Sequence, residues 1–207
     1  KGFYGQILKV YNAALRFMKR AADTAALCGR TEMASSLLRL TNHAPSNLFE
    51  ALQTSIIYYH LQQFFDGTYL RTLGRLDNLY YPYYARENKN EADKLLLDYI
   101  KEIDRFKALA NIPFALGGTD ENGECLINDL SYIWLDMYEK ARTTNTKLHI
   151  LYSEHTPEDI IRKAFRHIRG GNNSIVFMSD RRVIEALEKQ GVAHQDAVDY
   201  HVVGCYE

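Results

Sequence analysis

Cysteine is scarce in this sequence, which has three in 207 residues, and they stand far apart as Cys28, Cys125 and Cys205. So small and scattered a set excludes the cross-linked framework of a disulfide-rich secreted domain. We therefore expect a reducing, cytoplasmic setting for this chain.

The sequence also lacks an excess of charge of either sign and any long apolar run. It has 25 Lys and Arg against 26 Asp and Glu, a net charge of −1. Nothing in this balance favours nucleic acid or an anionic membrane surface as a partner. No apolar stretch approaches the roughly 18 residues that a membrane-spanning helix needs. The first ten residues do not resemble a signal peptide. We expect neither a nucleic-acid nor a membrane partner.

The composition that remains is that of an ordinary globular protein, 46% hydrophobic and 25% charged. The first part is helical in pattern, because apolar residues recur every three or four positions. We predict helices over about 4–28, 30–41 and 48–65, the last preceded by Asn47 and Glu50 at the spacing of a capping box. The tyrosine-rich stretch 69–84 has no clear period, and we predict an irregular buried loop there.

The second part alternates between strand and helix patterns. The predicted strands cover 112–116, 147–152, 174–177 and 201–203. The predicted helices cover about 90–110, 128–142, 157–169, 181–190 and 194–199, with Asp180 as the cap of the fourth. Such alternation predicts a parallel sheet with right-handed crossovers. Functional groups gather beyond the carboxyl ends of such strands, where Gly117, Gly118 and Cys205 stand.

A thiol and a carboxylate, Cys205 and Glu207, lie two positions apart in the final stretch DYHVVGCYE. In extended backbone they would face the same side. Spacing alone leaves three interpretations open for Cys205: a small buried apolar residue, a nucleophile, or a metal ligand together with His201 and Glu207. The sequence has no Cys-x-x-Cys or His-Glu-x-x-His motif, so the metal interpretation is weak and we expect no bound metal.

Four stretches spread over the chain match motifs of one enzyme family in order and spacing. They are LGRLDNLYYPYY (73–84), LGGTDENGECLINDLSY (116–132), HTPEDIIRKAFRHIRGG (155–171) and YHVVGCYE (200–207). Together they resemble the glycyl radical enzymes, whose founding member is pyruvate formate-lyase. The resemblance covers nearly the whole chain, loops as well as helices.

This resemblance implies an α/β fold, a ten-stranded α/β barrel with a finger loop that reaches into its centre. The chain would be the central portion of that domain. Residues 1–66 would form a helical part, and residues 67–207 would supply barrel strands and helices that end in the finger loop, with Cys205 at its tip. The family's glycyl loop has no counterpart in the sequence. We therefore expect a fragment of a longer chain that is inactive alone.

The resemblance also implies a chemistry. In the family, a radical S-adenosylmethionine activating enzyme installs a radical on a glycine, here outside the chain. That radical takes hydrogen from a thiol, which matches Cys205, and the thiyl takes hydrogen from a small-molecule substrate. A single cysteine followed two residues later by glutamate resembles the eliminases, where the residue matching Glu207 acts as the base.

The substrate pocket is assigned to Phe114 and Tyr206, and a homodimer is expected. Tyr206 stands where the eliminases usually have valine, which leaves the identity of the substrate open. The alternatives are a pyruvate formate-lyase-like acyltransferase, a radical decarboxylase, and a non-catalytic homologue that serves as a scaffold.

Overall fold

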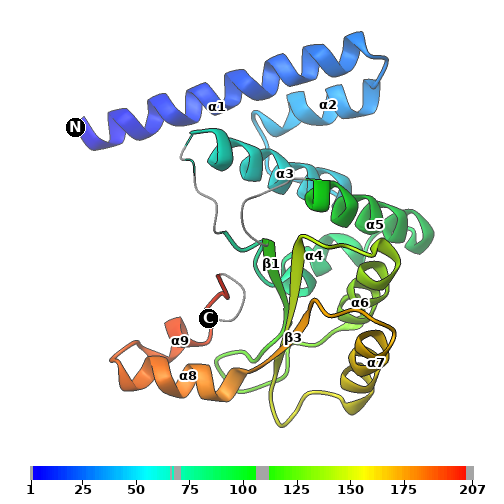
Figure 1. Cartoon of the computed structure of the whole chain (residues 1–207). Coiled ribbons are helices and arrows are strands. Elements are labelled where there is room, and N and C mark those ends of the chain that lie inside the picture. Colours follow the sequence, from blue (N-terminus) through cyan, green and yellow to red (C-terminus); the bar gives the residue numbers. More distant parts are fainter. Residues whose placement is uncertain (1, 66, 68–70, 106–111, 204–207) are drawn as a thin grey trace. The chain divides into compact units, whose positions relative to one another are not determined.

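A computed structural model describes residues 2–65, 67, 71–105 and 112–203, and the chain forms two compact units, Lys1–Gly67 and Thr68–Glu207 (Figure 1). The first unit contains α1 (Gly2–Leu27), α2 (Thr31–Leu40) and α3 (Leu48–Phe65). These bounds confirm the three helices predicted from apolar periodicity.

A buried carboxylate joins α2 to α3 in the first unit. Glu50 accepts hydrogen bonds from Arg39 Nε at 2.5 Å and from the backbone N–H and hydroxyl of Ser46 at 2.8 Å. The Arg39 hydrogen bond is the main cause that lowers the pKa of Glu50 to about 2. One half of the predicted capping box is present, because Asn47 Oδ1 accepts from the Glu50 N–H at 2.9 Å. The Glu50 side chain reaches Ser46 instead of closing the other half.

The second unit is built on a parallel sheet of β1 (Ile112–Gly117), β2 (Thr146–Tyr152) and β3 (Ile175–Ser179), in that order. Phe114 pairs with Leu148 and Leu148 with Ile175, so the described strands are in continuous register. The predicted parallel sheet and its first three strands are confirmed.

The helices of the second unit lie on both sides of the sheet (Figure 1). They are α4 (Leu76–Tyr84), α5 (Lys89–Arg105), α6 (Asp129–Ala141), α7 (Glu158–Arg169), α8 (Asp180–Lys189) and α9 (His194–Ala197). In Figure 1, α5, α6 and α7 lie on one side, and α8, α9 and residues 198–203 lie on the other. The end of the predicted helix 90–110 falls outside the described residues.

Two predictions for the second unit are wrong. Residues 76–84 form α4, not a loop, because Leu76, Tyr80 and Tyr84 recur every four residues and are all buried. Residues 201–203 form no strand. Val202 is buried as the pattern indicated, but it packs against Ala115 and Leu151 on the face of the sheet instead of pairing with a strand.

An extended segment before α4 follows the free edge of β1. The Leu73 N–H donates to the Pro113 carbonyl and the Ala115 N–H donates to the Gly74 carbonyl, both at 2.9 Å. Arg75 and Ala115 then form a parallel bridge. The segment therefore delivers the start of α4 to the carboxyl end of β1.

Five aromatic side chains fill the space between the sheet and its helices: Tyr80, Tyr99, Phe114, Trp134 and Tyr138. Neighbouring ring centroids in this aromatic core are 5.5 to 6.4 Å apart. Phe114 is 1% exposed and contacts the rings of Trp134 and Tyr138. Because successive strand residues face opposite ways, Phe114 and Ala115 lie on different faces of β1. Substrate contact by Phe114 stays a prediction.

Removing the ring of Phe114 should destabilise the second unit. We expect Phe114→Ala to lower the free energy of unfolding by about 3–5 kcal/mol, because the change leaves a cavity in a packed core. Urea unfolding of the chain, followed by the fluorescence of Trp134, its one tryptophan, measures this. The matched control is Phe165→Ala in α7, at a position 55% exposed, which should cost about 1 kcal/mol or less. Equal losses in both variants would contradict the core position of Phe114.

Candidate functional site

The carboxylate of Asp77, in the first turn of α4, is fully buried at the carboxyl end of β1. Its Oδ2 accepts from the Gly117 N–H at 2.8 Å and from the Ser131 hydroxyl at 2.5 Å. Its Oδ1 accepts from the backbone N–H of Asn78 at 2.9 Å. Asp77 thus joins the starts of α4 and α6 to the last residue of β1.

The two glycines at the carboxyl end of β1, Gly117 and Gly118, have no room for a side chain. Gly117 has a φ of +78°, and a Cβ there would lie 2.6 Å from Ile127 Cδ1. Gly118 has a φ of +91°, and a Cβ there would lie 3.0 Å from Arg75 Nη1 and 3.4 Å from Asp180 Oδ1. Both positions combine a backbone conformation that favours glycine with a close approach of other groups.

The guanidinium of Arg75 connects this strand end to the last described segment of the chain. Its Nη2 donates to the carbonyls of Val198 and Tyr200, the second at 3.3 Å. Its Cζ lies 5.4 Å from the centroid of the Tyr200 ring, within the range of a cation–π contact. The residue is only 7% exposed. A buried cation therefore holds residues 198–200, which lead into the Gly204-Cys205-Tyr206-Glu207 sequence.

A second buried carboxylate, that of Asp180, also lies beside Gly118. Its Oδ2 accepts from the Thr119 hydroxyl at 2.6 Å, and the residue is fully buried. Asp180 was predicted to cap α8. It is instead the first residue of that helix, and its carboxylate bonds to the loop after β1. Burial, together with the negative charge of Asp180, raises the pKa of Tyr200.

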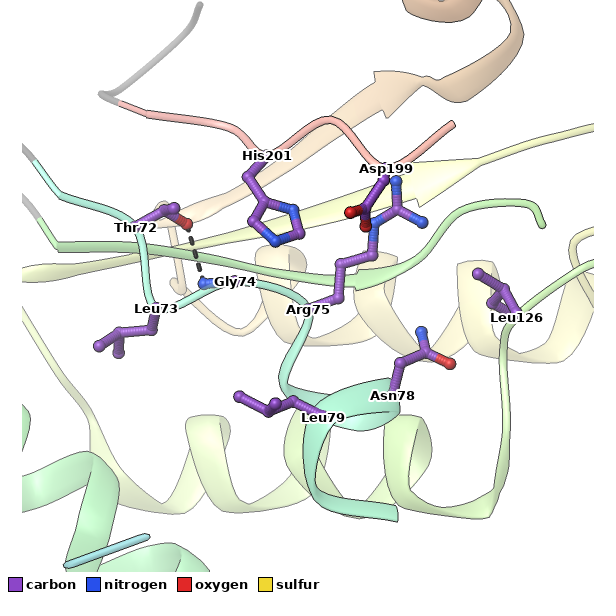
Figure 2. A pocket seen from close by; sticks show the side chains of 9 residues that line it. All are labelled: Thr72, Leu73, Gly74, Arg75, Asn78, Leu79, Leu126, Asp199 and His201. Atoms are coloured by element: carbon purple, nitrogen blue, oxygen red, sulfur yellow. Dashed lines mark hydrogen bonds between the residues drawn. The ribbon is translucent and has the colours of Figure 1, made fainter. Parts of the chain in front are cut away.

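A cavity of about 520 Å³ lies beside this network (Figure 2). Its polar lining includes Thr72, Arg75, Asn78, Asp199 and His201. His201 Nδ1 lies 2.9 Å from the Tyr200 carbonyl, which can only accept, so Nδ1 donates to it. Figure 2 shows the ring beside Gly74. The cavity therefore offers both donors and acceptors to a small polar molecule.

Three of the predicted site residues, Cys205, Tyr206 and Glu207, lie outside the described residues, and the fourth, Phe114, lies in the aromatic core. Within the part of the chain that the structure describes, no three His, Cys, Asp or Glu side chains are grouped to hold a metal ion. No helix in that part is long and apolar enough to cross a membrane.

The sequence analysis missed the buried network of Arg75, Asp77, Thr119, Asp180 and Tyr200. A signal for two of its members was present in LGRLD (73–77), where two opposite charges stand among apolar residues at a predicted buried site. Such charges are rarely buried unless they are paired. The Thr119–Asp180 hydrogen bond spans 61 positions in sequence and the Arg75–Tyr200 contact spans 125, so no local pattern predicts them.

The geometry brings together three of the four motif stretches, and comparison with known proteins finds the same family. The family model "Pyruvate formate lyase-like" matches residues 3–207. A curated relative, (2S)-3-sulfopropanediol dehydratase from Klebsiella oxytoca, is 23% identical over all of this chain and 29% of its own length. The chain thus spans less than a third of that relative.

Solved structures share the fold. A glycyl radical enzyme from Archaeoglobus fulgidus superposes with a TM-score of 0.80 at 22% identity, covering 95% of this chain and 29% of that one. The glycerol-bound form of the B12-independent glycerol dehydratase from Clostridium butyricum gives 0.76 at 20% identity, with 94% and 27% covered. The arrangement of sheet and helices is therefore that of glycyl radical enzymes.

The buried state of Asp77 should appear in the pH dependence of stability. Burial raises the pKa of Asp77 from 3.8 to about 6, against the opposing hydrogen bonds from Ser131 and Gly117. Between these values the folded chain keeps a proton that the unfolded chain has lost. The free energy of unfolding should therefore fall as the pH rises from about 4 to 6, by up to about 3 kcal/mol.

Urea unfolding at a series of pH values measures the free energy of unfolding of the wild type and of Asp77→Asn. The wild type should show this fall and Asp77→Asn should not, so the difference between the two proteins should change between about pH 4 and 6. The matched control is Asp98→Asn, at an exposed carboxylate in α5, which should keep the wild-type profile. Parallel curves for the wild type and Asp77→Asn would contradict the assignment.

Proposed function

Because the chain belongs to the pyruvate formate lyase-like family, we propose that it carries the thiol centre of a glycyl radical lyase of the dehydratase type. The observation that carries the proposal is the buried network around Arg75. It joins the LGRLD stretch, the LGGT stretch and the residues that lead to Cys205. The dehydratases among the relatives support elimination as the reaction class.

The proposed whole protein is larger than this chain, which spans 27% to 29% of the relatives described above. We place the chain in the central part of an α/β barrel, with residues 199–207 as the finger loop. A radical on a glycine outside this chain would take the hydrogen atom of the Cys205 thiol and so form the thiyl radical. A radical S-adenosylmethionine activating enzyme would install it, and a homodimer is the proposed assembly.

Cys205 and Glu207 each have a proposed role in the chemistry. The Cys205 thiyl takes a hydrogen atom from a hydroxyl-bearing carbon, and Glu207 accepts the proton of that hydroxyl. The neighbouring group leaves with its bonding electrons and that proton, and the product radical recovers hydrogen from Cys205. Val202, which precedes this stretch in sequence, packs on Ala115 and Leu151, and such apolar packing helps to keep water from a radical.

The two residues proposed for substrate contact differ in their support. Tyr206 is adjacent to the thiol in sequence, and its ring would narrow the pocket relative to the valine of related eliminases. Phe114 is buried on the face of β1 that packs against α6. Its proposed role is therefore to shape the strand that carries Ala115 and Gly117.

Anaerobic activation of the full-length protein tests the radical assignment. We expect a glycyl radical by electron paramagnetic resonance and, after exposure to air, cleavage at a glycine outside this chain by mass spectrometry. Cys205→Ser should form the same radical but lose all turnover, because an alcohol O–H bond is too strong to replace S–H. The matched control is Cys125→Ser, at the partly buried cysteine near Thr156, which should keep turnover. A protein with no radical signal, or an active Cys205→Ser variant, would refute the proposal.

Replacement of Glu207 tests the base. Glu207→Gln should keep the fold and the radical yet slow elimination by about 10²–10⁴-fold, the usual contribution of a positioned proton acceptor. The deciding measurement is hydrogen–deuterium exchange between a deuterated substrate and the enzyme thiol. Exchange that continues without product release supports a base that acts after hydrogen abstraction. Exchange lost together with turnover would mean that Glu207 positions the thiol or substrate, and the base role would be withdrawn.

A further inference from the structure

We propose that Arg75 is the positioning residue that holds the segment before Cys205 in place. Its link to catalysis rests on the proposed function, whereas its link to the segment rests on described contacts alone. The segment in question is residues 198–203, which we call the approach segment. Arg75 stands 123 positions earlier in the sequence than its first contact there, Val198.

The backbone of Arg75 is itself firmly placed. The two hydrogen bonds that join residues 73–74 to Pro113 and Ala115 fix it to the edge of β1. α4 begins at the next residue, and its Asp77 is bonded to Gly117 and Ser131. Arg75 is therefore held from both sides by the sheet, which makes it a rigid base for a long side chain.

The contacts of the Arg75 side chain suit a guanidinium specifically. Its Nη2 reaches two carbonyls, those of Val198 and Tyr200, while the planar group lies against the Tyr200 ring. A lysine ammonium is a compact charge that cannot stack in the same way. Gly118 leaves the space for this group, because a Cβ there would lie 3.2 Å from Arg75 Cζ. Gly118 and Tyr200 are therefore both suited to an arginine at position 75.

Two buried carboxylates balance the charge without using the donors that reach the approach segment. Asp180 Oδ1 borders the same space beside Gly118, and the charge of Arg75 acts to lower the pKa of Asp77. Both carboxylates have other hydrogen-bond donors, Thr119 for Asp180 and Ser131 for Asp77. The described hydrogen bonds of the guanidinium go instead to backbone carbonyls, which is what a clamp on a loop requires.

The approach segment depends on this clamp because it has no strand pairing. Residues 199–203 carry no regular secondary structure. Val202 packs on Ala115 and Leu151, and Val198 packs with Ile184 and Ala197. Apolar packing is non-directional, so it does not fix the orientation of the backbone. Arg75 supplies directional bonds to carbonyls at both ends of the 198–200 stretch.

Amide hydrogen exchange of the full-length protein, resolved by peptide, tests the clamp. In Arg75→Lys the peptide that covers 194–203 should exchange about tenfold faster or more, since hydrogen bonds from a charged donor are lost. The bonded amides of Asp196, Ala197 and Val198 give the signal. The peptide that covers β2 should be unchanged. The matched control is Arg181→Lys, at an exposed arginine in α8 that pairs with Glu185.

A second pair of variants keeps the test decisive if Arg75→Lys fails to fold. Tyr200→Leu removes the ring under the guanidinium and should also accelerate exchange in 194–203. Tyr200→Phe keeps the ring and should behave as the wild type. Equal acceleration in 194–203 and β2 would mean that Arg75 only stabilises the unit, and no acceleration in either variant would mean that no clamp exists. Either result would overturn the proposal.

A separate measurement, on the activated enzyme, tests the consequence of the clamp for catalysis. Arg75→Lys should keep the wild-type content of glycyl radical and lower kcat more than it raises KM, because the main effect is a misplaced thiol. An unchanged kcat would overturn the catalytic part of the proposal. If the wild type forms no radical, the proposed function fails, and the exchange experiment still decides the clamp.

Discussion

The second unit depends on one constraint, the burial of a guanidinium at the carboxyl end of β1. A charge taken out of water is costly unless it is paired and hydrogen-bonded. Here Arg75 is buried beside Asp77 and Asp180, and each of the three is bonded to a different part of the chain. The requirement to satisfy these groups fixes how α4, α6, α8 and the approach segment meet the sheet.

The glycine pair at the carboxyl end of β1 follows from the same constraint. Gly118 leaves room for Arg75 and Asp180, and the Gly117 N–H donates to Asp77. A side chain at position 118 would push the guanidinium away from its carbonyl partners. The pair lies at the C-terminal end of a parallel strand, where functional groups gather in parallel sheets. At this place the absence of a side chain at Gly118 leaves room for the charged groups of Arg75 and Asp180.

Local pattern predicted most of the elements and little of the site. The segments 112–116 and 48–65 are both rich in apolar residues on most sides, so β1 and α3 followed from sequence. α4 was missed because Pro82 and a run of tyrosines obscured the four-residue repeat of Leu76, Tyr80 and Tyr84. Residues 201–203 were predicted as a strand because burial produces the same apolar pattern whether or not a strand pairs. Cys205 and Glu207 were found through family motifs, whereas the contacts of Arg75 depend on tertiary structure alone.

The absence of strand pairing in residues 201–203 has a physical rationale under the proposed function. A strand is held along its whole length by neighbours in the plane of the sheet, and its side chains then face the layers above and below. A thiol that must stand away from the sheet needs backbone that leaves this plane. The carbonyls of such a segment need donors that reach off the sheet, and arginine combines a long side chain with five N–H donors. A finger loop of this kind is therefore best held by a side chain anchored at the edge of the sheet, which is where Arg75 lies.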